Sequence, residues 1–378
     1  MNKRLCRALG MLLTVIMPLA WLLLESNVAL AADQQPVKRY LYVVTPGIRN
    51  YLEFGGAGIL VFDIDNEYRW VRRIETPASR ESMPDNIKGV CADAPRGRLY
   101  FTTRSQLYCV DLRTEQTVWA RPLPGGTDRM SITPDGRVLY VPSLEQDTWN
   151  VVDPATGDLI TSIETRSGAH NTVVSRDGRF MYLGGLKSPL LFVADTRFHT
   201  IVGRVGPLGG SVRPFTVDGQ SRRAYVCVND LLGFEVANLE TGNLEHRVEV
   251  RGFERGPVKR HGCPSHGIGL TPDESQVWVV DAFNQRVHIF DNRESPPRQL
   301  ADVPLREQPG WITFRMDGKH AWLSTGEIID VATRKVVARL GDEQGREVHS
   351  EKMVELHFQN GRPVANGDQF GVGRVVTP

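Results

Sequence analysis

The decapeptide HGCPSHGIGL, which begins at His261, places three side chains favoured by transition metals within six residues. Imidazole nitrogen and thiolate sulfur are common ligands of zinc and copper, so His261, Cys263 and His266 form a candidate metal site, with His170 as a candidate fourth ligand. The spacing lacks the second cysteine pair or the closely spaced histidine pair of a structural zinc site. This first hypothesis is therefore an open metal site.

Two other interpretations of the decapeptide stay open. An exported chain can oxidise its thiols, and a disulfide between Cys227 and Cys263 would remove the thiolate that the metal hypothesis needs. In the simplest interpretation CPSHGIGL is the start of a strand, in which Gly267 and Gly269 permit close packing and His266 faces a cavity. The choice depends on the elements that position these residues.

The first 31 residues have the features of an export signal. Three cations precede a mainly apolar stretch at 11–24, and Ala29-Leu30-Ala31 supplies the small residues of a cleavage site. That stretch is shorter than the roughly 18 residues of a spanning helix. We predict a cleaved signal peptide at 1–31, one domain at 32–378, a periplasmic or secreted location and no stable membrane insertion.

The net charge argues against nucleic acid as a partner, and the cysteine content does not require a disulfide-stabilised core. Removal of residues 1–31 takes away three cations and Glu25, so the formal charge falls from +1 to about −1. Such a chain has no global field that attracts nucleic acid. Four cysteines remain, and a domain of this size does not depend on disulfides for its core. They are Cys91, Cys109, Cys227 and Cys263.

A turn followed by an aromatic-bearing strand recurs along the chain. Its aromatic anchors are Tyr42, Tyr100, Tyr140, Tyr182, Tyr225, Trp278 and Trp322. From Tyr100 onward the successive gaps are 40, 42, 43, 53 and 44 residues. An alternating apolar strand precedes the strand that carries the anchor. The anchor strand is followed by a strand that ends in a turn with an acidic residue or asparagine, and this turn leads into one more strand. Four short strands per repeat predict an all-β, seven-bladed β-propeller.

The termini predict how the ring closes. The first copy, around Tyr42, has no strand before it, whereas 351–358 resembles an innermost strand with nothing complete behind it. Pairing of this C-terminal inner strand with the N-terminal strands completes a seventh blade and leaves no open edge.

The repeat TPDGRVLYVPSLEQDTWNVVDPATGDLITSIET at 133–165 resembles the YVTN-type propeller repeat, with LYVP at 139–142 in the place of the tetrapeptide that names the family. The resemblance extends over about 38–358. It implies an exported or surface-associated propeller. Related seven-bladed propellers include lactonases and the propeller subunits of amine dehydrogenases.

In a propeller the innermost strands all begin around the mouth of the central channel. Aligning the repeats gives one equivalent position per blade, namely Lys88, Asp128, His170, Arg213, His266, Gly310 and Lys352. A concave ring rich in cations and histidines is typical of a site for a small anion, although solvated channel mouths are often polar without a function. Long loops at 45–58 and 250–264 are expected on the same face.

Three functions are consistent with these features. The first is a non-catalytic binding or scaffold protein for a small anionic ligand or a protein partner. The second is a lactonase or lyase in which His170 or His266 is the general base and Arg213 stabilises an oxyanion. The third, implied by the resemblance alone, is an accessory subunit that docks a periplasmic redox partner. No cofactor is predicted beyond the metal ion of the first hypothesis.

Overall fold

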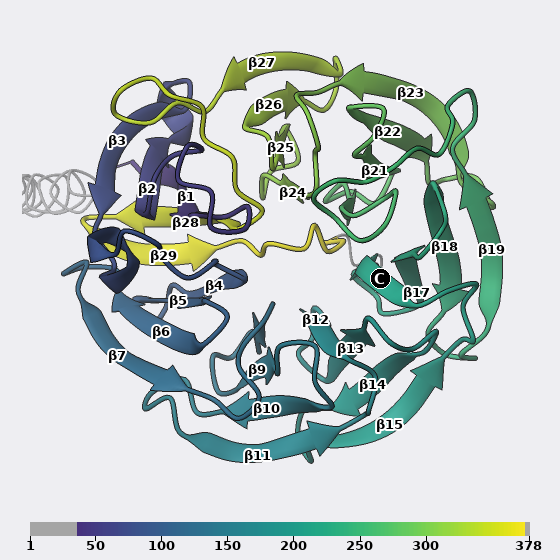
Figure 1. The fold of residues 1–378 in the computed structure, drawn as a ribbon, viewed down its shortest axis with the longest axis horizontal. Coiled ribbons are helices and arrows are strands. Elements are labelled where there is room, and N and C mark those ends of the chain that lie inside the picture. The colour runs from purple at the N-terminus through teal and green to yellow at the C-terminus, as the bar shows by residue number, and fades with distance from the viewer. Residues whose placement is uncertain (1–35, 375–378) are drawn as a thin grey trace, which may run out of the picture.

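A computed structural model describes residues 36–374 of the 378-residue chain. The predicted signal peptide at 1–31 lies outside the described residues. Seven antiparallel sheets stand around one axis, which confirms the predicted all-β, seven-bladed propeller (Figure 1). The only helices in the described part are two 3-10 turns, η1 (Ile64–Asn66) and η2 (Pro77–Arg80). No helix within residues 36–374 has the length and apolar character needed to cross a membrane.

Six blades have four strands each, running from the inside of the ring to the outside. The second blade has β4 (Gly89–Asp93), β5 (Arg98–Thr102), β6 (Gln106–Asp111) and β7 (Thr117–Pro122). The third has β8 (Ser131–Ile132), β9 (Leu139–Pro142), β10 (Thr148–Val152) and β11 (Leu159–Glu164). The fourth has β12 (Ala169–Val174), β13 (Phe180–Gly185), β14 (Leu191–Asp195) and β15 (Thr200–Val205).

The other three four-stranded blades follow the same order. The fifth has β16 (Val212–Val217), β17 (Arg223–Val228), β18 (Gly233–Asn238) and β19 (Leu244–Glu249). The sixth has β20 (Ile268–Leu270), β21 (Gln276–Asp281), β22 (Arg286–Asp291) and β23 (Arg298–Pro304). The seventh has β24 (Ile312–Phe314), β25 (His320–Leu323), β26 (Glu327–Asp330) and β27 (Lys335–Arg339).

The aromatic anchors lie where the repeat predicts them. Each is on the second strand of a four-stranded blade, or on β1 (Lys38–Thr45) in the first, and all seven side chains are at most 2% exposed. Large rings at one register position fill the space between neighbouring sheets, which removes apolar surface from water. This repeated packing holds the inner strands at equal spacing around the axis.

The turns after the third strands are closed by the predicted acidic residues. The Asp195 carboxylate accepts hydrogen bonds from the backbone N–H groups of Arg197 and Phe198, at 2.8 and 3.0 Å. Asn238 does the same for Glu240 and Thr241. A side-chain oxygen that binds the backbone two and three residues on stabilises the turn locally, which explains why these residue types recur there.

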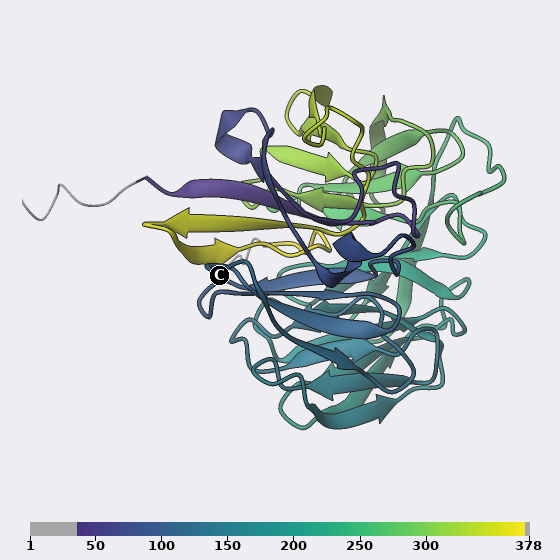
Figure 2. The ribbon, with the colours of Figure 1, turned by 60° about the vertical axis from the view of Figure 1, so that its left-hand side comes forward.

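The first blade joins the two ends of the chain, as predicted. β28 (Met353–Gln359) pairs with β1, which continues to β2 (Gly58–Asp63) and β3 (Arg69–Ile74); Figure 2 shows yellow β28 beside purple β1. This confirms the predicted closure of the ring, and β29 (Arg362–Asn366) adds a fifth strand at the other edge of β28, which the repeat does not predict. Asn360 and Gly361, at φ 53° and 72°, form the tight turn between β28 and β29.

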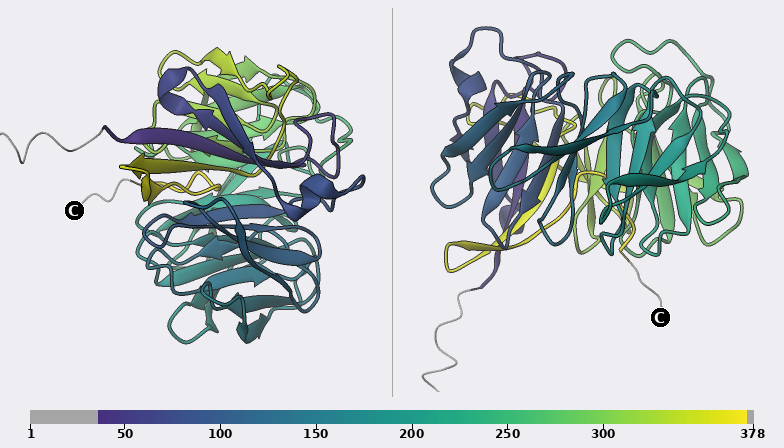
Figure 3. Two further views of the ribbon diagram at one scale, coloured as in Figure 1. Left: turned by 90° about the vertical axis from the view of Figure 1, so that its left-hand side faces the viewer. Right: turned by 90° about the horizontal axis from the view of Figure 1, so that it is seen from below.

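After β29 the chain crosses the central channel, a segment that we call the C-terminal plug (367–374). The crossing is visible in Figure 1, and the side views of Figure 3 show the ring that surrounds it. The Gln369 carbonyl accepts hydrogen bonds from the side chains of Trp311 and Thr313, and the Gly371 carbonyl accepts from the Leu270 N–H and the Thr216 hydroxyl. The plug therefore binds the fifth, sixth and seventh blades.

Candidate functional site

The inner strands begin around a basin of about 470 Å³ at the mouth of the channel. Five of the seven predicted ring residues line it: Lys88, His170, Arg213, His266 and Lys352. Asp128 is fully buried next to them, and Gly310 contributes its carbonyl oxygen. Because each residue starts the inner strand of a different blade, residues far apart in sequence meet in one place. The common register is what brings the predicted set together.

Asp128 binds two residues of neighbouring blades. His170 Nδ1 lies 2.7 Å from one carboxylate oxygen, and the Lys88 ammonium lies 3.3 Å from the other. Burial alone would raise the pKa of Asp128, but His170 and Lys88 outweigh it and hold that pKa below its ordinary value. Burial lowers the pKa of His170 despite the nearby carboxylate. The pair is thus an aspartate that accepts from a neutral imidazole.

Glu351 forms a second buried cluster, which the sequence analysis missed. Its Oε2 accepts hydrogen bonds from Arg129 and, at 2.9 Å, from Lys352. Burial would raise the pKa of Glu351, yet Lys352 and Arg129 together hold it well below its usual range. Burial lowers the pKa of Lys352 to about 7. The Arg129 guanidinium also lies 3.6 Å above the ring of Trp311.

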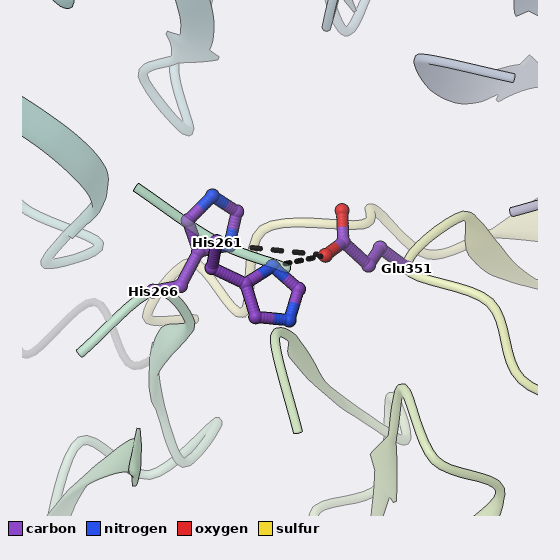
Figure 4. A group of neighbouring side chains, drawn as sticks. All are labelled: His261, His266 and Glu351. Atoms are coloured by element: carbon purple, nitrogen blue, oxygen red, sulfur yellow. Dashed lines mark ion pairs between the residues drawn. The ribbon is translucent and has the colours of Figure 1, made fainter. Parts of the chain in front are cut away.

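His261 and His266 stack on one another beside Glu351, with ring centroids 4.6 Å apart (Figure 4). His261 Nε2 is 3.2 Å from the Gln308 carbonyl, and His266 Nδ1 is 2.9 Å from the Gly310 carbonyl. A Cβ at Gly310 would lie 2.2 Å from the His261 ring. The seventh blade therefore offers no side chain at its ring position, and His261 of the long loop takes that space.

The predicted role of Cys263 in this site is wrong. Its sulfur donates to the Ser265 carbonyl at 3.0 Å, and burial raises its pKa to about 12, so the thiol keeps its proton. Of the described histidine, cysteine and acidic side chains, His261 and His266 are grouped with Glu351 instead. The proposed disulfide is not formed either, because Cys227 and Cys263 are both free, buried thiols.

The two long loops meet at the rim of the basin, as expected for loops on one face. The Arg49 guanidinium of the first loop donates to the Arg260 carbonyl of the second at 3.1 Å. The Arg260 guanidinium in turn lies over the rings of Tyr51 and Phe54, with centroid distances of 5.8 and 5.2 Å. Arg213 reaches the second loop through the Gly262 carbonyl at 3.1 Å. The loops thus build a cationic rim.

The basin carries far more positive than negative charge. Seven cations line it, namely Arg49, Lys88, Arg129, Lys187, Arg213, Arg260 and Lys352. Only two carboxylates do, Glu145 and Glu351. A neighbouring groove of about 800 Å³ shares Arg49, Lys88 and Lys187 with the basin and extends it toward the second and third blades. The site can accommodate an anion larger than a single phosphate.

Arg129 and Glu351 each stand one position away from a predicted ring residue. Arg129 follows Asp128, and Glu351 precedes Lys352. The Arg129–Glu351 ion pair joins the third and first blades at the channel mouth. Reading the neighbours of each ring position, rather than that position alone, would have found both residues.

Comparison with known proteins supports the fold. No protein-family model matches the chain. A 6-phosphogluconolactonase of Klebsiella pneumoniae is 24% identical over 240 residues, covering 59% of this chain and 72% of the relative. A chain of the Kuenenia stuttgartiensis hydrazine synthase structure aligns with TM-score 0.58 and 14% identity, over 75% of this chain and 89% of that one.

A chain of the mitotic checkpoint complex aligns similarly, with TM-score 0.59 and 12% identity over 77% of this chain and 88% of that one. At such low sequence identity, the structural similarity shows only that the fold is shared. The protein is therefore a seven-bladed β-propeller, a class to which the resemblance to YVTN-type repeats also pointed. Within that class it is similar to a phosphosugar lactonase.

Proposed function

We propose that this protein binds a small anionic ligand, a carboxylate or a phosphate ester, in the basin at the channel mouth. The observation that carries the proposal is the excess of seven cations over two carboxylates around a cavity of about 470 Å³. Low-dielectric walls focus the field of such a cavity on whatever enters it. One of its two carboxylates, Glu351, is already bound by Arg129 and Lys352.

The donors of the basin suit oxyanions. The Nε and Nη1 groups of Arg129 have no hydrogen-bond partner in the described part of the chain, although both are buried. Buried guanidinium donors are rarely left unpaired in native proteins. Arg213 on the rim adds a planar fork that matches a carboxylate or phosphate. The export signal expected at 1–31 would place this binding in the periplasm or outside the cell.

Binding of inorganic phosphate and citrate by titration calorimetry tests the proposal. We expect Arg213→Ala to weaken binding by about 10- to 100-fold, because hydrogen bonds to charged groups are worth about 1.5–3 kcal/mol. Arg255→Ala is the matched control, since Arg255, in the long loop at 250–264, pairs with Asp230 and does not line the basin. Absence of binding to either anion, or equal losses in the two variants, would refute the proposal.

A second candidate function is hydrolysis of an anionic lactone. Two observations favour it: the similarity to a 6-phosphogluconolactonase, and the Asp128–His170 pair at the basin wall. Asp128 accepts the Nδ1–H of His170, which leaves Nε2 unprotonated. In this mechanism Nε2 takes a proton from water as the water oxygen attacks the lactone carbonyl. Arg213 stabilises the oxyanion, and the imidazolium returns the proton to the departing ring oxygen.

Turnover of a panel of phosphorylated and unphosphorylated sugar lactones tests this candidate. We expect His170→Ala to lower kcat by about 10²- to 10⁴-fold, the usual contribution of a general base. His246→Ala is the control, because His246 contacts Ser295 on the outside of the ring. No turnover by the wild-type protein, or unchanged turnover in His170→Ala, would leave anion binding as the function of the basin.

A further inference from the structure

A second feature of the basin is independent of any anionic ligand. His261, His266 and Glu351 are all buried, and one ligand atom from each lies within 4.8 Å of the other two. They come from the long loop, the start of the sixth blade and the start of β28, so the fold brings them together from distant parts of the chain. Figure 4 shows both rings turned toward the same carboxylate oxygen.

The distances between these groups exceed those of ordinary hydrogen bonds. Glu351 Oε1 lies 3.3 Å from His261 Nδ1 and 3.8 Å from His266 Nδ1. An N–H···O bond spans about 2.7–3.2 Å. Two ligands of a tetrahedral zinc ion, with bonds of about 2.1 Å, are about 3.4 Å apart. The spacing therefore fits donors arranged around a shared cation better than donors bonded to each other.

Hydrogen bonds with neighbouring groups leave one atom each of His261 and Glu351 free to bind a cation. The Gln308 carbonyl faces His261 Nε2, so the neutral ring carries its proton there and turns a bare Nδ1 toward Glu351. Lys352 and Arg129 bind Oε2 and leave Oε1 facing the two rings. The bare nitrogen and the carboxylate oxygen are both acceptors. A cation between them removes this conflict.

His266 needs one change before it can act as a ligand. Its Nδ1 lies at hydrogen-bonding distance from the Gly310 carbonyl and donates a proton to it in the absence of a cation. Coordination through Nδ1 requires this proton to move to Nε2, which gives the other neutral tautomer of the ring. Imidazoles bind metal only in the neutral form, so their protonation competes with the metal. We therefore expect affinity to fall as the pH is lowered, and His261 to contribute more than His266.

We propose that His261, His266 and Glu351 form an open binding site for a divalent transition metal of the zinc class. Two imidazoles and one carboxylate are three protein ligands, which leaves a fourth position free. All three residues line the basin, so that position faces the proposed ligand cavity. Mg²⁺ and Ca²⁺ favour sites with more oxygen ligands than this single carboxylate. This inference goes beyond the proposed anion binding and does not depend on it.

Zinc titration of the tag-free, chelator-treated full chain tests the inference. We expect one Zn²⁺ per chain, and at least ~100-fold weaker binding in His261→Ala, because even residues that only support a ligand are worth 10- to 100-fold. Cys263→Ser and His246→Ala are the controls, since one removes a neighbouring thiol and the other a histidine on the outer strand β19 that contacts Ser295. Both are expected to bind zinc like the wild type.

Co²⁺ supplies a second readout, because its visible absorption bands report nitrogen and oxygen ligands without any assay of activity. Circular dichroism of His261→Ala separates loss of the site from loss of the fold. Absence of zinc binding by the folded wild type would overturn the inference. It would also be overturned if His261→Ala bound zinc as tightly as the wild type, or if Cys263→Ser or His246→Ala lost the site. Phosphate binding by a protein that takes no metal would leave the proposed function standing.

Discussion

Two buried carboxylates, Asp128 and Glu351, stand in the same basin with similar partners but different geometry. Each binds a lysine, Lys88 at 3.3 Å and Lys352 at 2.9 Å, and each faces histidine. His170 lies at 2.7 Å from Asp128, whereas the two rings near Glu351 are at 3.3 and 3.8 Å. The Asp128 carboxylate holds the Nδ1 proton of His170, whereas the Glu351 carboxylate lies too far from both rings for an ordinary hydrogen bond. Distance, more than residue type, separates the two roles.

The clusters also differ in their access to solvent. The Lys88 side chain is 16% exposed, while the side chains of Arg129 and Lys352 are 3% and 4% exposed. A lysine at the cavity surface can turn to water when its partner is removed. A sealed guanidinium and ammonium cannot. The Glu351 cluster is therefore the one in which charge balance matters more for folding.

The largest effect is expected from neutralising the sealed carboxylate. Glu351→Gln leaves Arg129 and Lys352 facing an uncharged partner, which lowers the free energy of unfolding by about 3–5 kcal/mol, as breaking a buried ion pair does. Asp128→Asn should cost less, about 1–3 kcal/mol, because Lys88 can reach solvent and the amide still bonds to a neighbour. Urea denaturation at neutral pH measures both values.

Burial of the two partners predicts the order of these losses, so equal losses would contradict the comparison. The double variant with Arg129→Met separates a specific pair from general disruption. Removing the guanidinium as well should restore part of the stability lost in Glu351→Gln, because the unpaired charge is gone. Additive losses would show that the two residues do not act as a pair.

The fold could be predicted from the sequence because every blade contains a recognisable copy of the sequence repeat. The anchors Tyr100 to Trp322 recur at nearly constant spacing, and each marks the same strand. The fifth strand β29 was missed although Asn360-Gly361 is a strong hairpin signal. It lies beyond the last repeat, where periodicity gives no guidance, and the plug that follows has no counterpart in any other blade.

Only those site residues that occupy equivalent positions on the inner strands could be predicted from the sequence. Ring positions such as Lys88 and His170 follow from the start of each inner strand. Glu351 was missed because its contacts with His261 and Arg129 join three distant segments, a loop of irregular length among them. The same loop explains the error at Cys263, since spacing along the chain suggested a ligand where the backbone turns the thiol toward Ser265.

The smallest effect is expected at the Asp128 cluster, as a dependence of stability on pH. Burial lowers the pKa of His170 below the ordinary value of about 6.5 that it has in the unfolded chain. Between these two values the unfolded chain binds more protons, so the free energy of unfolding falls as the pH drops through that window. Above about 6.5 the contribution of His170 is constant and fully present. The lowered pKa of Asp128 matters only at more acidic pH, near and below about 3.9.

His170→Gln should therefore flatten the decline in stability between pH 7 and pH 5, by up to about 1.4 kcal/mol per pH unit. Glutamine keeps a donor for Asp128 but does not titrate. Urea denaturation at several pH values measures the slope, with His246→Gln on the outer strand β19 as the matched control. A slope that is the same in His170→Gln and the wild type would mean that the Asp128–His170 pair does not hold a neutral imidazole. The proton-orienting role assigned to Asp128 would then fail, while the gap beside Glu351 would be unaffected.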